Sequence, residues 1–310
     1  MTVDRVYKAL ASSVETNLSG LYSKDKEFLD ANYKRWKEGF DRLQLFRHYC
    51  IEAGQAFQEE FLKYPQFVTD PLLGVLMRLH AHACRIAGEI IALMINGYAD
   101  GVLSRWRTLH EIVITCLLLK THGRPAAEDY IRYGLVQSVN GMKGYQGTAQ
   151  AMGREPYSMD ELEEATRLQE KILNQCGNDL LSRNGWARKY VGSSKLENLQ
   201  KAVGLEKWRN DYAIASRDIH PDYREMRTLY AMSEAKQDVL LCGQSNSGMV
   251  EPAHYTAIAL SQITVTFILT YTDDEKCPID HTGSAIYAKL LDCLVVEIGD
   301  TFLTLDRKSL

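Results

Sequence analysis

The sequence predicts an all-α fold: a single multi-helix bundle with N-terminal helices packed on its side. Apolar side chains recur every three or four positions over long stretches, which is the period of an amphipathic helix. Prolines are scarce, with 7 in 310 residues, so these stretches run on with few interruptions. No stretch alternates apolar and polar residues as a half-buried strand does. We expect an N-terminal helical extension at 1–70 and a core helical bundle at 71–310.

The first helices expected along the chain are long. An apolar stripe predicts a helix within 31–64; its members are Trp36, Phe40, Leu43, Phe46, Cys50, Ala53 and Phe57. Asp70 followed by Pro71 has the pattern of an N-cap with proline at the first helical position. A second helix is therefore expected over 71–96, and a third over 98–121.

The rest of the chain is predicted to be helical in shorter pieces. Residues 126–153 have helical spacing broken by glycines, and Ser158 with Glu161 has the capping-box pattern at the start of the next helix. The segment 257–271 is rich in β-branched residues, yet its length and the preceding Pro252 favour a buried helix. The further elements expected are a helix at 158–175, short helices and loops at 176–207, two helical pieces within 208–235 separated at His220-Pro221, and helices at 251–272 and 283–304.

Composition limits the class of protein. Hydrophobic residues make up 45% of the chain, enough for a sizeable core. The formal net charge of −4 and the pI near 6.1 provide no broad basic surface, so we expect no general DNA binding. The longest aliphatic run, 112–119, is far shorter than the roughly 20 residues of a membrane span.

The cysteines and the N-terminal segment indicate a compartment. The seven cysteines are odd in number and include no CxxC pair, which predicts buried thiols in a reducing environment. The N-terminal residues lack the apolar core of a secretory signal. We expect a cytoplasmic protein with no membrane partner.

A polar stripe on the third expected helix is the first candidate site. At roughly 100° per residue, Asp100, Ser104, Arg107 and Glu111 fall in one narrow sector, with His110 beside it. Arg107 and Glu111 are four residues apart and can form an ion pair. The helix is otherwise apolar and belongs inside the bundle, where an unpaired charge is costly. The stripe is either an ion pair that fixes helix register or the lining of a ligand or catalytic pocket.

Ser216 and His220 form the second candidate site, because they lie four residues apart on one helix face. Pro221 ends that helix, and the helix dipole there favours a protonated His220 ring. Asp218 or Asp222 would complete a Ser-His-Asp triad, although no GxSxG motif accompanies them. We expect the two candidate sites to meet in space, since buried polar groups need partners. A histidine beside a carboxylate there would have a pKa above its ordinary value of about 6.5.

A metal centre is a weaker alternative. His80 and Cys84 share a helix face and are side chains of the kinds that bind zinc. Two ligands do not complete a site, so we expect no metal and no cofactor.

Gly97, Arg107 and Glu111 form one motif, an Arg-x-x-x-Glu early in a core helix after a glycine that ends the preceding helix. A second motif has Ser-x-x-x-His after a tyrosine, formed by Tyr212, Ser216 and His220. Together the two motifs resemble a family of uncharacterised bacterial helical proteins. The resemblance covers about 75–270 and implies a helical fold and a bacterial origin, without an activity.

Arg105 and His110 have four residues between them, and Arg42 and His48 have five. This Arg-then-His spacing resembles that of HEPN-type helical proteins, many of which are ribonucleases of toxin or anti-phage systems. Trp106 stands where a polar residue commonly follows the HEPN arginine. The resemblance implies metal-independent RNA cleavage, and Arg105 to His110 overlaps the polar stripe.

Our first functional hypothesis is a helical effector that binds a phosphate of RNA or of a nucleotide. Arg105 or Arg107 would hold the phosphate, and His110 or His220 would act as general acid or base. Glu111 would orient one of these side chains, and Ser216 belongs to the same candidate site. As an enzyme, the protein would be a metal-independent, HEPN-like ribonuclease of a bacterial defence or toxin system. Candidate partners are RNA or a nucleotide, a second copy of the chain, or another protein.

The alternative is a non-catalytic helical interaction or scaffold protein in which the polar cluster specifies packing. A cleft open to solvent that contains Arg107, His110 and His220 would favour the first hypothesis. An enclosed, internally paired cluster would favour the alternative.

Overall fold

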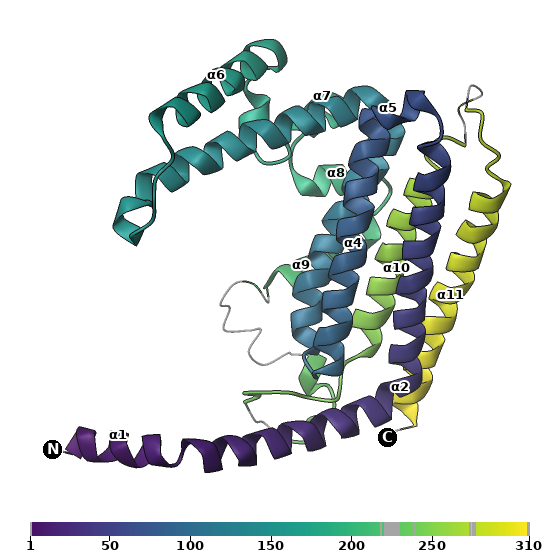
Figure 1. The fold of residues 1–310 in the computed structure, drawn as a ribbon. Coiled ribbons are helices and arrows are strands. Elements are labelled where there is room, and N and C mark those ends of the chain that lie inside the picture. Colours follow the sequence, from purple (N-terminus) through teal and green to yellow (C-terminus); the bar gives the residue numbers. More distant parts are fainter. Residues whose placement is uncertain are drawn as a thin grey trace.

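A computed structural model describes residues 2–217, 219, 230–237, 240–272, 274 and 277–308 of the chain. Every regular element among these residues is a helix, and none is a strand. The predicted all-α class is therefore confirmed (Figure 1).

Five long helices form the bundle. They are α2 (Val14–Phe61), α4 (Pro71–Ile95), the first half of α5 (Ala99–Thr148), α10 (Val250–Ile268) and α11 (Thr282–Arg307). Over the bundle these helices run side by side (Figure 1), and α10 contacts each of the other four. Large, fully buried side chains fill the space between them; they include Trp36, Phe40, Phe46, Trp106, Phe267 and Phe302.

The ends of the bundle helices follow local sequence signals. Asp70 caps α4 by accepting a hydrogen bond from the Leu73 amide at 2.9 Å, with Pro71 in the first turn. Asn96 ends α4, and Gly97 turns the chain with a φ of 80°, a value that favours glycine. Both boundaries are where the sequence predicts them.

The N-terminal arm consists of α1 (Thr2–Ser12) and the part of α2 before residue 32. No residue of α1 is buried, and burial in α2 begins at Asn32. In Figure 1 this arm extends away from the lower end of the bundle. Residues 32–61 of α2, by contrast, pack against α4, α10 and α11 as one of the bundle helices. The expected domain boundary at residue 70 stays a prediction, and these contacts cross it.

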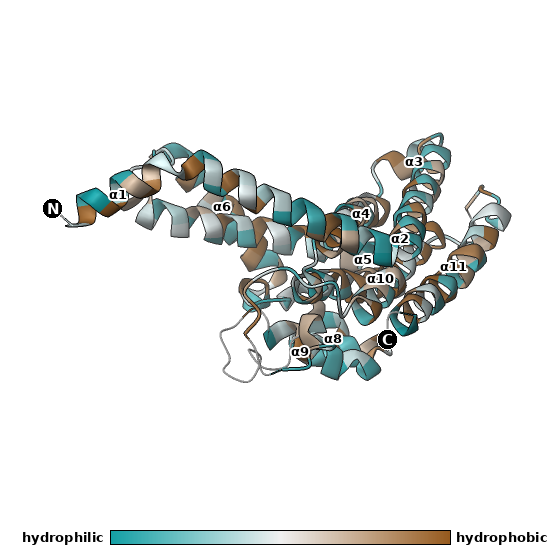
Figure 2. Cartoon of the chain, turned by 90° about the horizontal axis from the view of Figure 1, so that it is seen from below, coloured by the Kyte–Doolittle hydropathy of each residue, from teal (hydrophilic) through white to brown (hydrophobic). Residues whose placement is uncertain are grey.

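The second arm begins at a kink in α5. Gly123 has φ 67° and ψ −153°, which breaks the helix close to its predicted end at 121. The chain then continues as a helix to Thr148, and α6 (Met159–Cys176) packs back along it. Ser158 and Glu161 form the predicted capping box at the start of α6. Both arms project from opposite ends of the bundle toward the same side (Figures 1 and 2).

Short helices connect the second arm to the bundle, as predicted for 176–207. They are η2 (Asn178–Leu181), η3 (Gly185–Ala187), α7 (Arg188–Val191), α8 (Leu196–Ala202) and η4 (Glu206–Trp208). The remaining elements are α3 (Pro65–Val68), η1 (Gln150–Met152), α9 (Arg209–Arg217) and η6 (Tyr230–Met232). The predicted break at His220-Pro221 lies outside the described residues.

The structure bears on two expectations from the sequence, the burial of the cysteines and the lack of a membrane span. All seven cysteines are free, but only Cys50, Cys84 and Cys116 are buried. Cys242 and Cys293 are exposed, so the expectation of uniformly buried thiols is wrong for the cysteines on the loop before α10 and on the outer face of α11. Within the described part of the chain, no helix has the length and apolar character needed to cross a membrane.

Candidate functional site

The polar stripe of α5 is organised around Glu111. Arg107 and Glu111 lie one turn apart, and the Arg107 Nη2 atom is 3.1 Å from Glu111 Oε1. The predicted ion pair is therefore present. The two side chains are 24% and 30% exposed, so the pair lies at the edge of the bundle, within reach of solvent.

Helix α9 brings Tyr212 onto this ion pair. Arg107 Nε donates to the Tyr212 hydroxyl at 2.9 Å, and that hydroxyl donates to Glu111 Oε1 at 2.5 Å. The Arg107 guanidinium also lies 5.2 Å from the centre of the Tyr212 ring. Burial, with the hydrogen bond to Glu111, raises the pKa of Tyr212, so its hydroxyl keeps the proton that it donates.

The two regions singled out in the sequence thus meet, but through Tyr212. Ser216, one turn further along α9, donates its hydroxyl proton to the Tyr212 carbonyl at 2.8 Å. This hydrogen bond stays within α9. We had expected the Ser216–His220 face to be the partner of Arg107 and Glu111. His220 itself, with Asp218 and Asp222, lies outside the described residues.

A second arginine reaches Glu111 from the turn between η2 and η3. The Arg183 Nη2 atom lies 3.2 Å and 3.1 Å from the two Glu111 carboxylate oxygens. Attraction to Glu111 raises the pKa of Arg183. The Arg183 side chain is 66% exposed, so it is accessible from solvent. We call Arg107, Glu111, Arg183 and Tyr212 the Glu111 cluster.

His110 lies beneath the Glu111 cluster in a closed apolar environment. Its ring packs between Trp106 and Tyr212, with centroid distances of 5.3 Å and 5.7 Å, and only 2% of the residue is exposed. Burial lowers its pKa to about 4, despite the opposing influence of Glu111 and Asp211. At His110, desolvation of the imidazolium outweighs the attraction of the nearby carboxylates, whereas the raised pKa expected for His220 stays a prediction because His220 lies outside the described residues. The Nε2 atom is buried without a hydrogen-bond partner.

Arg105 leaves α5 on a different side. Its Nη2 atom lies 2.6 Å from Glu89 Oε2 on α4, and Glu89 also pairs with Arg85 at 3.3 Å. Arg105 and His110 therefore have the HEPN-like spacing in sequence but do not lie in one cluster. The other pair with that spacing lies on α2, where Arg42 pairs with Glu38 and Glu297, and His48 with Glu52.

Asp100, the first member of the predicted stripe, has structural partners. Asp100 accepts hydrogen bonds from the backbone amides of Tyr230 and Ala231, at 2.7 Å and 3.1 Å. Burial raises the pKa of Asp100. Asp100 therefore anchors Tyr230 and Ala231 to α5. It has a structural role and is not a member of the Glu111 cluster.

Sequence reasoning missed two members of the cluster as site residues. Tyr212 is part of the Tyr-x-x-x-Ser spacing, and its position one turn before Ser216 was a usable signal. Arg183 had none, since it lies in a turn between two short 3₁₀ helices. Next to the cluster, the Tyr255 hydroxyl donates to Asp211 at 2.8 Å, and Trp106 Nε1 donates to the Tyr255 carbonyl at 3.1 Å. These contacts hold α9 against α5 and α10.

The His80 and Cys84 pair is also built into the core. The Cys84 sulfur lies 3.6 Å from His80 Nε2, which is 3.2 Å from the Thr264 hydroxyl. Burial lowers the pKa of His80 to about 4 and raises that of Cys84 to about 12. Across the ranges that the structure describes, no group of three or more potential ligands is arranged for a metal ion.

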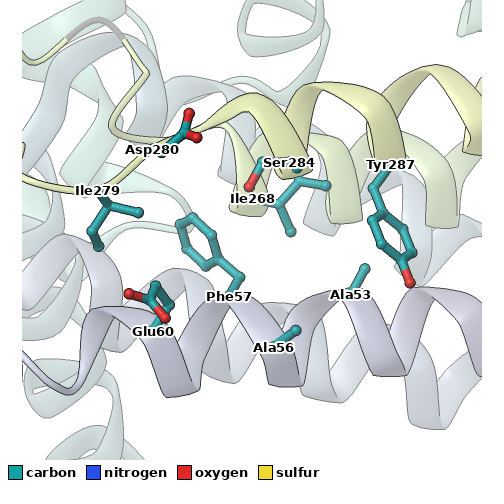
Figure 3. A pocket seen from close by; sticks show the side chains of 10 residues that line it. Ala53, Ala56, Phe57, Glu60, Ile268, Ile279, Asp280, Ser284 and Tyr287 are labelled. Atoms are coloured by element: carbon teal, nitrogen blue, oxygen red, sulfur yellow. The ribbon is translucent and has the colours of Figure 1, made fainter.

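A crevice of about 390 Å³ lies between α2, α10 and α11, away from the Glu111 cluster (Figure 3). Its floor is apolar, with Phe57 and Ile268 among the lining residues. Two carboxylates lie at its rim, but Glu60 pairs with Lys63 and Asp280 caps Thr282. Both carboxylates of the crevice thus have partners on their own helix or turn, and none of the charged groups singled out in the sequence lines it.

Comparison with known proteins identifies a family whose function is unknown. A model described as a family of unknown function, DUF5677, matches residues 73–238, which contain all four members of the Glu111 cluster. No curated protein and no solved structure matches the chain. Because the match spans more than half of the 310 residues, this chain belongs to the family of unknown function DUF5677.

Proposed function

We propose that the protein binds a phosphate group of RNA or of a nucleotide at the Glu111 cluster. The observation that carries the proposal is the pairing of two guanidinium groups, Arg107 and Arg183, with one carboxylate. Each guanidinium has five N–H donors in a rigid fork, and Glu111 uses only some of them. The Arg183 side chain is 66% exposed, so a phosphate in solvent can reach it and accept from the donors that Glu111 does not use.

Charge supports a local site of this kind. Arg107 and Arg183 contribute two positive charges against one negative charge on Glu111, on a chain whose net charge is −4. A ligand would therefore be attracted to this place and not to the surface as a whole. Glu111 and Tyr212 hold Arg107 in position before a ligand arrives, which reduces the entropy lost on binding.

In its enzymatic form the proposal is a metal-independent, HEPN-like ribonuclease of a bacterial defence or toxin system. The arginines would stabilise the charge that develops on the phosphorane, and a histidine would move the proton. His110 is neutral and enclosed, so proton transfer falls to His220, four residues beyond Ser216 in the sequence. This assignment rests on the sequence motif. A cytoplasmic location is proposed from the cysteines and the N-terminal segment.

Equilibrium binding of labelled single-stranded RNA and of nucleotides tests the proposal. Arg183→Ala should weaken binding by about tenfold or more, the usual effect of removing a charge-assisted hydrogen bond. Arg188→Ala is the matched control, because Arg188 is a nearby exposed arginine that pairs with Asp179 outside the cluster. Equal binding by the two variants, or none by the unaltered protein, would reject the proposal.

The enzymatic form needs its own measurement. Purified protein is incubated with total RNA, and fragments are compared for the unaltered chain, His220→Ala and His110→Ala. We expect cleavage to disappear with His220→Ala. Binding without cleavage would retain the phosphate site and remove the ribonuclease.

The non-catalytic alternative also has an observation in its favour. Glu111 is fully engaged by Arg107, Arg183 and Tyr212, so the cluster satisfies itself without a ligand. On that view the cluster fixes α9 and the η2–η3 turn against α5. Arg107→Ala would then lower stability, and neither RNA nor nucleotides would bind to the unaltered protein.

A further inference from the structure

The N-terminal arm carries an exposed apolar stripe. Its members are Val3, Tyr7, Leu10, Val14, Leu18 and Leu21, with exposures between 39% and 80%. They recur with an 11-residue period: position 14 follows position 3, 18 follows 7, and 21 follows 10. Figure 2 shows hydrophobic segments, in brown, along this arm. We call these six residues the arm stripe.

The arm stripe continues the face that α2 buries inside the bundle. Two further periods beyond Val14, Leu18 and Leu21 lead to positions 36, 40 and 43. These positions are Trp36, Phe40 and Leu43, which are buried in the core. The same face of α1 and α2 therefore packs against other helices from Asn32 onward. Before Asn32 this face has no buried residue.

The shape of the stripe indicates a helical partner. At roughly 100° per residue, its six members fall within about 80° around the axis, and the exposed side chains of Val6 and Tyr22 flank them on either side. An apolar seam with an 11-residue period is typical of helices that pair along their length.

The charges of the arm argue against a membrane surface. Residues 2–31 contain four basic side chains, Arg5, Lys8, Lys24 and Lys26. The five acidic side chains of the same segment are Asp4, Glu15, Asp25, Glu27 and Asp30. Helices that bind anionic membranes instead carry a clear excess of lysine and arginine on the polar face.

We propose that the arm stripe pairs with the arm stripe of a second copy of this chain, antiparallel and centred on Val14. The spacing of five of its six members is self-complementary about that residue, and Val3 alone would face a polar residue, Asp25. Leu10 lies four positions before Val14 and Leu18 four after it, so each would face the other in the second copy. Tyr7 and Leu21 are related in the same way, as are the opposite charges of Asp4 and Lys24. Such a contact is isologous, as a twofold dimer requires.

Sedimentation of the full chain over a range of micromolar concentrations tests the proposal. The arm is one helix wide and about 40 Å long, so we expect concentration-dependent association toward twice 35.2 kDa. Leu10→Lys/Leu21→Lys should remain monomeric over that range. Ser12→Lys/Ser23→Lys adds the same charge on the opposite face of the arm and should associate like the unaltered chain. All four positions are exposed, so neither variant should alter thermal unfolding of the bundle.

Mixing variants tests the orientation. Leu10→Lys and Leu18→Glu should each impair self-association, and their equimolar mixture should restore it, because the introduced lysine and the introduced glutamate face each other only in the antiparallel pair. A monomer at every concentration, equal effects of the two double-lysine variants, or no recovery in the mixture would overturn the proposal. Binding of the monomer to phosphatidylcholine vesicles through the arm stripe would overturn it in favour of a membrane surface.

Discussion

At the scale of single residues, Arg105 and Arg107 of α5 can be compared for their contributions to stability, because each pairs with a different glutamate. Arg107 pairs with Glu111 and also donates a hydrogen bond to Tyr212 on α9, whereas Arg105 pairs with Glu89 on α4. Both ion pairs are partly exposed, where such a pair contributes about 0–1 kcal/mol, so the added hydrogen bond to Tyr212 distinguishes Arg107. The contribution of each arginine to folding stability therefore depends on which neighbours its side chain meets on leaving α5.

We expect Arg107→Ala to destabilise the fold more than Arg105→Ala. Glu111 keeps Arg183 after the change, so the loss should be about 1–2 kcal/mol, less than for a carboxylate left alone. Urea unfolding of the two variants measures the difference. A larger loss with Arg105→Ala would mean that the Glu111 cluster contributes little to the packing of α9 on α5.

His110 should make stability fall as the pH is lowered from 7 to 4. Its pKa is about 4 in the folded chain and about 6.5 when unfolded, so between these values the unfolded chain binds the proton more readily. Acid therefore favours unfolding, by about 3 kcal/mol over the whole interval for a shift of this size.

His110→Phe checks this pH dependence, since phenylalanine keeps a ring between Trp106 and Tyr212 without a titrating group. The unfolding free energy of the variant should decline less between pH 7 and pH 4. His80 has a similarly lowered pKa and contributes equally to both proteins, so it cancels in the comparison. Parallel pH profiles for the two proteins would contradict the prediction.

At this scale, the sequence predicts side-chain contacts between residues of the same helix. The Arg107–Glu111 pair follows from four-residue spacing. Arg183 was not predictable, because 72 residues separate it from Glu111 and no periodic pattern places the η2–η3 turn. The environment of His110 was missed for a related reason: a helical wheel gives the direction of a side chain but not the neighbour, here Tyr212 on α9, that covers it.

At the scale of elements, Gly123 sets the direction of the second arm. Its φ of 67° with ψ of −153° belongs to a backbone region that is essentially restricted to glycine. A Cβ there would meet no atom within 4 Å, so any cost of substitution comes from the backbone alone. Gly123→Ala should therefore cost about 1–3 kcal/mol or straighten α5.

Gly141→Ala is the control for this prediction. Gly141 lies in the same arm, in regular helix, with equally open space around a Cβ. Alanine there should stabilise the arm by about 0.5–1 kcal/mol. Chemical unfolding gives the energies, and small-angle scattering detects a change in the arm's direction. Equal behaviour of the two variants would show that the Gly123 conformation is not a constraint.

The contrast between the helix ends and the arm direction shows what local sequence can predict. Asp70, Gly97 and Ser158 mark helix ends that depend on neighbouring residues, and all three are where the sequence places them. The break before Pro125 was expected too. The angle at which the chain leaves the break depends on one ψ value at Gly123, and no spacing rule encodes it.

At the scale of the whole molecule, the bundle and the N-terminal arm have separate supports. The bundle is held by the core between α2, α4, α5, α10 and α11. The arm contributes no buried residue before Asn32. Where the two meet, the Asn32 amide donates to the carbonyls of Met94 and Ile95 at 3.0 Å and 2.8 Å, joining α2 to the last turn of α4. Substitutions that change the stability of the bundle should therefore differ from those that change self-association through the arm.

Deleting residues 2–27 should leave the thermal unfolding midpoint of the bundle nearly unchanged, because the deleted side chains make no part of the core. Asn32→Ala in the full chain is the contrasting variant. It removes the side-chain donor of the Ile95 carbonyl, whereas the Met94 carbonyl keeps the Gly97 amide at 3.0 Å, and it should cost about 1–2 kcal/mol. Calorimetry of both proteins measures the difference. If the deletion lowers stability more than Asn32→Ala does, the exposed arm supports the bundle of its own chain, and its apolar stripe is not free to pair with a second copy.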